Sequence, residues 1–378
     1  MRLLYVAQGH PRQEADDCSM FESMDVKWFS TGHYSQNHSP GILPTLHHHA
    51  SEDVIKEFAH CKGSTDVHSQ PNGPIGKGYT QYTNNKYVHN IWKFTSNFLA
   101  NFDIVLFNHF TENLENNWGM LRELGIPSAI KVFGMHPMNW ENPIRKFKQQ
   151  GLYVIRNSPT EDKKYKANFA GVDIVIRGSS IVSDQVLSGW IGNIKQVVTF
   201  TNHIAGDQLR HQGYVGTHNM LNNTYPMKLY GSQNHNYGLS SGFLTQEEKI
   251  NTLRNSRVAL CTGTRNANNT YSFVEAWVMG IPQIVFGPKL WTAPYCEILD
   301  LMKHGYDGFI VNTPKEAVKY IHMLMEDDDL AQTISKRSRE KALKIYGYDV
   351  LKQKWRQAFQ EITDQKLPPP KTNSQNKN

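Results

Sequence analysis

The chain has 378 residues, of which 39% are hydrophobic and 11% aromatic, a composition that excludes an intrinsically disordered protein. Its length suits two domains of roughly 150–200 residues each rather than one core. The formal net charge of +6, from 40 Lys and Arg against 34 Asp and Glu, is mildly basic; it is compatible with an anionic ligand or surface but requires neither.

The cysteines and the apolar runs predict a cytoplasmic protein. No C-x-x-C pair occurs and the spacing is wide, which favours a reducing compartment over a disulfide framework. The N-terminal apolar run is too short for a signal peptide, and no later run approaches the roughly 18 apolar residues of a membrane span. Peripheral contact with a membrane stays open, and the oligomeric state is not indicated. The cysteines are Cys18, Cys61, Cys261 and Cys296.

In the first half of the chain, short apolar runs alternate with segments of helical spacing, whereas residues 10–100 are polar and only weakly periodic. Glycine and proline punctuate the runs. The predicted strands are 3–7, 102–110, 126–137 with its loop, 152–158, 172–180 and 195–202, and the predicted helices are 111–125 and 183–190.

The second half repeats this alternation more regularly, and its tail after residue 365 is polar and rich in proline, which predicts disorder. The predicted strands begin at about 226, 257, 282 and 307. The predicted helices are 245–256, 273–279, 314–327, 330–347 and 348–363.

Strands that alternate with helices predict parallel βαβ units, and hence two doubly wound, Rossmann-like α/β domains. We expect an N-terminal domain over 1–192, a second domain over 193–345, a helix over 346–365 that returns to the first domain, and a disordered tail over 366–378. Ligands of such folds bind beyond the carboxyl ends of the strands. The loops at Gly9, His136, Gly231, Gly263 and Ser272 should therefore open on a cleft between the domains.

The segment "TYSFVEAWVMGIPQIVF" (270–286) places an acid, Glu275, in an otherwise apolar helix. Two hypotheses account for it. Ser272 and Glu275 match the S-x-x-E capping box, in which the two side chains bind the free amides of the helix start. Alternatively, Glu275 faces a ligand in an open crevice.

Several motifs resemble the GT-B glycosyltransferases, specifically the retaining family 4. In order they are "DIVLFNHF", "LGIPSAIKVFGMHP", "GVDIVIRGSSIVSDQVL", "VVTFTNHIAGD", "FVEAWVMGIPQIVF" and "HGYDGFIVNT" with the helices after it. The resemblance covers roughly residues 100–365 and is closest over 257–345. It implies transfer of a sugar from a UDP- or GDP-sugar, with retention and without a metal ion or other cofactor, to a glycan or glycoconjugate.

The resemblance also implies roles for particular residues. Glu275 would bind the ribose hydroxyls of the donor, and His136 would contact the donor sugar; these two are the catalytic candidates. The donor diphosphate would lie at the start of the helix, where free amides and the helix dipole favour an anion. The donor-binding candidates are Gly231, Thr264, Arg265, Thr270, Tyr271, Ser272, Phe273 and Glu275.

The acceptor-side candidates are Gly9, His10 and His109. Gly9 and His10 end the first strand, where a glycine allows close backbone approach to a substrate. His109 ends a later strand of the same domain. We expect the acceptor to enter from this domain.

The sequence departs from the family in two places. Of the family's two glutamates, with seven residues between them, the first falls on Ala267. No Arg and Lys pair for the diphosphate is found between Asp207 and Lys228.

These departures keep other functions open: an epimerase on the same scaffold, or a homologue that binds nucleotides without catalysis. A DNA-modifying glycosyltransferase is a further alternative, weakly supported by the basic charge. The "HHH" at 47–49 lacks ligand spacing, because consecutive side chains do not share a face, so no metal site is predicted.

Overall fold

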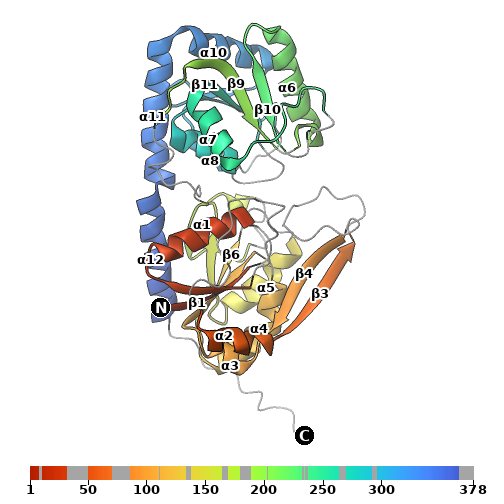
Figure 1. Cartoon of the computed structure of the whole chain (residues 1–378), viewed down its shortest axis with the longest axis vertical. Coiled ribbons are helices and arrows are strands. Elements are labelled where there is room, and N and C mark those ends of the chain that lie inside the picture. The colour runs from red at the N-terminus through yellow and green to blue at the C-terminus, as the bar shows by residue number, and fades with distance from the viewer. Residues whose placement is uncertain are drawn as a thin grey trace. The chain divides into compact units, whose positions relative to one another are not determined.

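The computed structural model describes the chain in two compact units (Figure 1). The first unit comprises Met1–Asn157, Tyr165–Ile176 and Lys352–Asn378, and the second comprises Ser158–Lys164 and Arg177–Leu351. Residues 177–192 thus group with the second unit, whereas the sequence placed them in the first domain. The described residues are 1–7, 11–31, 50–69, 86–109, 111–132, 138–163, 169–178, 189–201, 203–231, 234, 237–263, 270–291 and 296–365.

The first unit is built on a six-stranded parallel sheet. Its strands are almost continuously apolar, which is typical of parallel strands covered on both faces. In sheet order the strands are β2 (Lys27–Ser30), β1 (Arg2–Val6), β5 (Ile104–Asn108), β6 (Ser128–Val132), β7 (Tyr153–Arg156) and β8 (Ile174–Val175).

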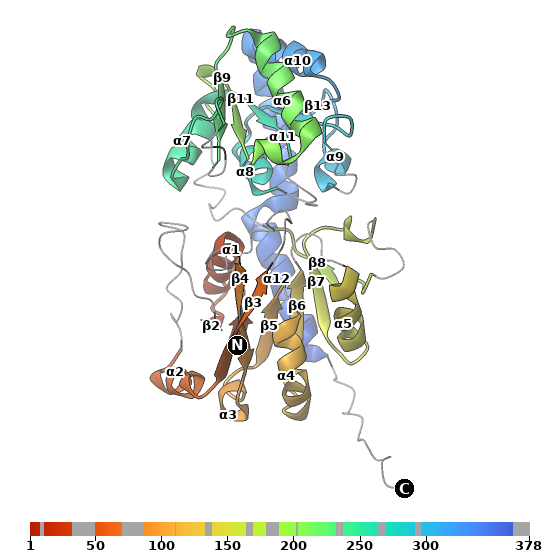
Figure 2. The ribbon, with the colours of Figure 1, turned by 90° about the vertical axis from the view of Figure 1, so that its right-hand side faces the viewer.

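Helices cover both faces of this sheet, because successive side chains of a strand point to opposite sides. On one face Tyr5 of β1 contacts Phe21 of α1 (ring centroids 5.7 Å apart), and Phe21 contacts Trp355 of α12 (5.0 Å). On the other face the core joins strand residues such as Val105 to α3, α4 and α5. Figure 2 shows α4 in front of the sheet and α12 behind it. The helices are α1 (Pro11–Glu22), α2 (Glu52–Ala59), α3 (Ser96–Leu99), α4 (Glu112–Glu123), α5 (Met138–Lys148) and α12 (Tyr348–Asp364).

An antiparallel hairpin, β3 (Lys62–Ser69) and β4 (Lys86–Lys93), stands beside α4. The side chain of Asn113 accepts from the backbone N–H of Trp92 (2.6 Å), and that of Asn117 accepts from the N–H of Phe94 (2.8 Å). Because these asparagines lie four residues apart, both face the same side of α4. They therefore tie β4 and the residue after it to this helix.

The second unit is built on a five-stranded parallel sheet. In sheet order the strands are β10 (Met227–Tyr230), β9 (Ile194–Phe200), β11 (Ser256–Cys261), β12 (Gln283–Phe286) and β13 (Phe309–Val311). Its helices are α6 (Gln208–Leu221), α7 (Gln246–Asn255), α8 (Tyr271–Met279), α9 (Glu297–Leu301), α10 (Pro314–Glu326) and α11 (Asp328–Tyr346). Helix α6 packs on α10, and α8 packs on α7 and α11.

Local sequence fixes the starts of these helices. Thr245 and Glu248 form a capping box at α7. Thr313 caps α10 with Pro314 at its first position, and Asp327 caps α11. The acidic run 326–329 is thus the junction of two helices.

Most strands and helices predicted after residue 100 are present at nearly the predicted bounds, and the predicted fold class is confirmed. The predicted helix at 183–190 lies almost entirely outside the described residues, and the histidines at 47–49 lie wholly outside them. Helices α1, α2, α3, α5, α6 and α9 and strands β2, β3 and β4 were not predicted. In the part of the chain that the structure describes, no helix combines the length and apolar character needed to cross a membrane.

Candidate functional site

Helix α8 follows residues 264–269 and the strand β11. Thr270 is its N-cap residue, and Gly280, with φ +88°, ends it in the left-handed conformation that glycine tolerates. All residues from Phe273 to Met279 are buried, because the helix lies inside the second unit.

The capping-box hypothesis for Ser272 and Glu275 is wrong. The helix begins one residue earlier than predicted, so Ser272 lies inside it and Glu275 lies beyond its first turn. The Ser272 hydroxyl instead donates to the backbone carbonyl of Phe200 at the end of β9 (3.1 Å). Glu275 therefore has another reason to stand in this helix.

The carboxylate of Glu275 is paired with the ammonium group of Lys249 on α7. Glu275 is 1% exposed, and the Lys249 side chain is 17% exposed. A buried carboxylate is costly unless a charge or hydrogen-bond donors compensate it, and Lys249 supplies both. The open carboxylate expected from the sequence is thus a buried one that carries a lysine counterion.

Two aromatic rings complete this site. The Lys249 ammonium lies 5.2 Å from the ring centroid of Phe200, a cation–π distance, and the Phe200 ring stacks on Tyr230 of β10 (5.3 Å). Gly231 follows Tyr230 directly. We call Phe200, Tyr230, Lys249, Ser272 and Glu275 the Glu275 cluster; it joins the carboxyl ends of two neighbouring strands to α7 and α8.

The end of β11 is fixed by close packing. Gly263 has φ +75°, and a Cβ there would lie 2.2 Å from the ring of Trp291, so only glycine fits. Its carbonyl accepts from the buried guanidinium of Arg210 on α6 (2.8 Å), which also donates to the carbonyl of His203. Residues 264–269 therefore leave the sheet from a rigid point.

Burial raises the pKa of the Cys261 thiol to about 11, and the nearby Thr270 hydroxyl acts in the opposite direction. All four cysteines are free thiols. At neutral pH Cys261 is a neutral group of the strand end and not a nucleophile.

The structure brings together some of the predicted donor-binding residues. Ser272 and Glu275 belong to the Glu275 cluster, and Gly231, Thr270 and Tyr271 adjoin its members along the chain. The Phe273 side chain packs in the core against Trp277 (4.9 Å), so only its backbone is available to a donor. Thr264, Arg265 and Ala267 lie outside the described residues, as do His136, Gly9 and His10.

His109 directly follows β5 in the first unit. It is one of a few described non-glycine residues with positive φ (+65°), and its backbone N–H donates to the carbonyl of Lys131 (2.8 Å). Non-glycine residues in this conformation are uncommon and concentrate at functional sites. This geometry agrees with the acceptor-side prediction for His109 without testing it.

A buried polar network lies beside His109. The Asn108 amide donates to the Tyr5 hydroxyl (2.9 Å) and to Glu14 of α1 (3.0 Å), and the Tyr5 hydroxyl donates to Asp17 (3.0 Å). Lys131 of β6 forms an ion pair with Asp17. Burial raises the pKa of Asp17, and Lys131 and Tyr5 act in the opposite direction.

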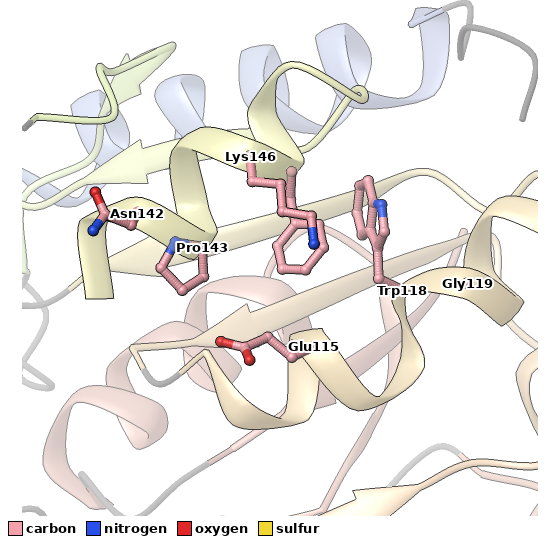
Figure 3. A pocket seen from close by; sticks show the side chains of 7 residues that line it. Glu115, Trp118, Gly119, Asn142, Pro143 and Lys146 are labelled. Atoms are coloured by element: carbon pink, nitrogen blue, oxygen red, sulfur yellow. The ribbon is translucent and has the colours of Figure 1, made fainter. Parts of the chain in front are cut away.

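A groove of about 530 Å³ lies between α4 and α5 in the first unit (Figure 3). Lys146 extends between Pro143 and Trp118 in this view, and the rings of Trp118 and Phe147 are 5.0 Å apart. One acid, Glu115, and one base, Lys146, line it, so it carries no net charge. Its lining residues include none of those predicted for the site.

Two parallel α/β units with these strand orders define the fold class of the GT-B glycosyltransferases, in agreement with the prediction. No family model and no curated protein matches the sequence. The assignment to family 4 stays a prediction.

Solved structures with a similar fold include three glycosyltransferases or related proteins at low sequence identity. HepE from Anabaena, in complex with UDP and glucose, is 13% identical; the match covers 96% of this chain and 100% of HepE, with a TM-score of 0.62. A glycosyltransferase from Rickettsia africae is 11% identical over 97% of this chain and 99% of its own, with a TM-score of 0.65. TarM is 11% identical over 95% and 98%, with a TM-score of 0.61. At such identities the likeness establishes the fold.

The sequence interpretation missed Lys249, Arg210 and the network of α1. A usable signal existed for two members of that network: Lys131 interrupts the buried run "AIKV", and Asn108 ends the buried run "IVLF". Lys249 stands in a polar helix, where one lysine among several charged residues carries no signal.

Proposed function

We propose that this protein is a glycosyltransferase that transfers a sugar from a UDP- or GDP-sugar to an acceptor. The observation that carries the proposal is the Glu275 cluster: a carboxylate fixed at the carboxyl end of a parallel sheet, on the helix that follows residues 264–269. Ligands of open α/β folds bind at this edge.

The donor would be held by the second unit. Glu275 would accept hydrogen bonds from the ribose hydroxyls, and Gly231 and Thr270–Phe273 would line the donor. Residues 264–269, with Arg265, would face the diphosphate together with the start of α8, where the helix dipole favours an anion. In support, HepE has been crystallised with UDP and with UDP-glucose.

Retention of the anomeric configuration and independence from a metal ion follow from the family resemblance and are part of the proposal. His136 would contact the transferred sugar. The acceptor would be a glycan or glycoconjugate bound by the first unit, near Gly9, His10 and His109. A related fold supports this choice, since TarM from S. aureus was crystallised with an α-GlcNAc-glycerol.

The experiment that tests the proposal follows the release of nucleoside diphosphate. The full-length protein is incubated with UDP-glucose, UDP-GlcNAc and GDP-mannose, with and without glycan acceptors and with duplex DNA carrying hydroxymethylpyrimidines. We expect release that depends on a glycan. Release only with DNA would move the acceptor to nucleic acid, and binding without turnover would indicate a non-catalytic homologue.

A further inference from the structure

The pairing of Glu275 with Lys249 sets a condition for any ligand of this carboxylate. One carboxylate oxygen, Oε2, holds the lysine ammonium, and the acid is nearly fully buried. A carboxylate offers about four lone-pair sites, so one lysine does not exhaust its capacity to accept hydrogen bonds. A ligand can therefore bind Glu275 while Lys249 stays in place.

Lys249 is itself held in place from three directions. The capping box of Thr245 and Glu248 fixes the start of α7, so Lys249 is presented to α8 from a defined turn. The ring of Phe200 lies 5.2 Å from the ammonium, and Ser272 of α8 binds the Phe200 carbonyl. The lysine and the acid thus share one rigid frame, as a preorganised binding group requires.

We propose that Lys249 is a positioning residue for recognition of the donor ribose and acts through Glu275. It keeps the buried carboxylate ionised and turned so that it accepts hydrogen bonds from the ribose hydroxyls. This inference rests on the proposed function, because it requires a nucleotide at the Glu275 cluster. Lys249 itself makes no contact with the nucleotide.

Affinity for the ribose hydroxyls is isolated by comparing UDP with 2′-deoxy-UDP, and GDP with 2′-deoxy-GDP, by titration calorimetry. The wild-type protein should prefer the ribonucleotide about tenfold or more, since a hydrogen bond to a charged group is lost in the deoxy analogue. In Lys249→Met the preference should fall to about twofold or less, as it should in Glu275→Gln. The double variant should lose no more than either single one, because the two residues act as a unit.

The matched control is Lys341→Met. Lys341 also pairs with a buried acid of the second unit, Asp307 (2.7 Å; 1% exposed), outside the Glu275 cluster. This variant should lose stability but keep the full preference for the ribonucleotide. Lys249→Arg, which retains the charge, should keep most of the preference and serves if Lys249→Met fails to fold.

The outcomes separate the two proposals. An unchanged preference in Lys249→Met would make the lysine merely structural and overturn the inference, while the proposed function would stand. Equal loss of both nucleotides would place Lys249 on the ligand itself and also overturn it. If the wild-type protein binds neither UDP nor GDP, the proposed function fails and this inference fails with it.

Discussion

Replacing Gly263 by alanine should destabilise the second unit, for two separable reasons. An alanine with φ +75° costs about 1 kcal/mol in backbone strain. Its Cβ would lie 2.2–2.4 Å from atoms of the Trp291 ring, and such overpacking of a core typically costs about 1–3 kcal/mol. Together these give about 3 kcal/mol, or about 6–12 °C in the melting temperature of a unit of this size.

Differential scanning calorimetry measures this loss, and the chain supplies its own controls. Gly242 also has positive φ (+93°), but no atom lies within 4 Å of its Cβ position, so Gly242→Ala should cost only the backbone strain of about 1 kcal/mol. In a Trp291→Leu background, Gly263→Ala should likewise cost only about 1 kcal/mol. Equal melting temperatures for Gly263→Ala and Gly242→Ala in the otherwise unchanged chain would refute the steric account of this strand end.

Three further predictions concern charges and thiols. Lys131→Met should cost about 3–5 kcal/mol in urea denaturation, because it leaves Asp17 as a buried unpaired charge, and adding Asp17→Asn should recover most of the loss. Arg2 lowers the pKa of Asp103, so this pair stabilises the fold above the unfolded-state pKa and the stabilisation is lost as the pH falls through the lower folded-state value; Asp103→Asn should flatten that part of the stability curve between about pH 5 and pH 2, and an unchanged curve would contradict the assignment. Since the pKa of Cys261 is raised to about 11, only about 0.1% of it is thiolate at pH 8, and iodoacetamide should label it far more slowly in the native than in the urea-unfolded protein.

The second unit was largely predictable because its sequence obeys simple rules. Apolar runs such as "RVALC" form buried parallel strands, and caps such as Thr313 with Pro314 mark helix starts. Helix α6 escaped prediction for the opposite reason. Gly213 and Gly216 stand in its interior, where close packing against Phe286 and Pro314 requires them, and helix propensity alone argues against such a helix.

The first hundred residues were not predictable from periodicity because their elements are held by tertiary contacts. Helix α1 carries buried acids, Glu14 and Asp17, on the face that should be apolar; they are compensated by Asn108, Tyr5 and Lys131 from strands distant in the sequence. A pattern of apolar residues does not report a polar face whose partners lie elsewhere in the chain.

The candidate site was predictable in part. Glu275 and its helix stood out by motif, but the identity of its counterion depended on the packing of α7 against α8 and could not be read from the sequence. The capping box was a reasonable interpretation of S-x-x-E. It was wrong because Thr270, rather than Ser272, caps the helix.

The central claim is that Glu275 binds the ribose of a nucleotide. Titration calorimetry of UDP and GDP against the wild-type protein and Glu275→Ala tests it most directly. We predict that the wild-type protein binds at least one of the two and that Glu275→Ala binds it at least tenfold more weakly, in line with the loss of a charged hydrogen-bond acceptor. Equal affinity in the two proteins, or no binding to either nucleotide, would contradict the claim.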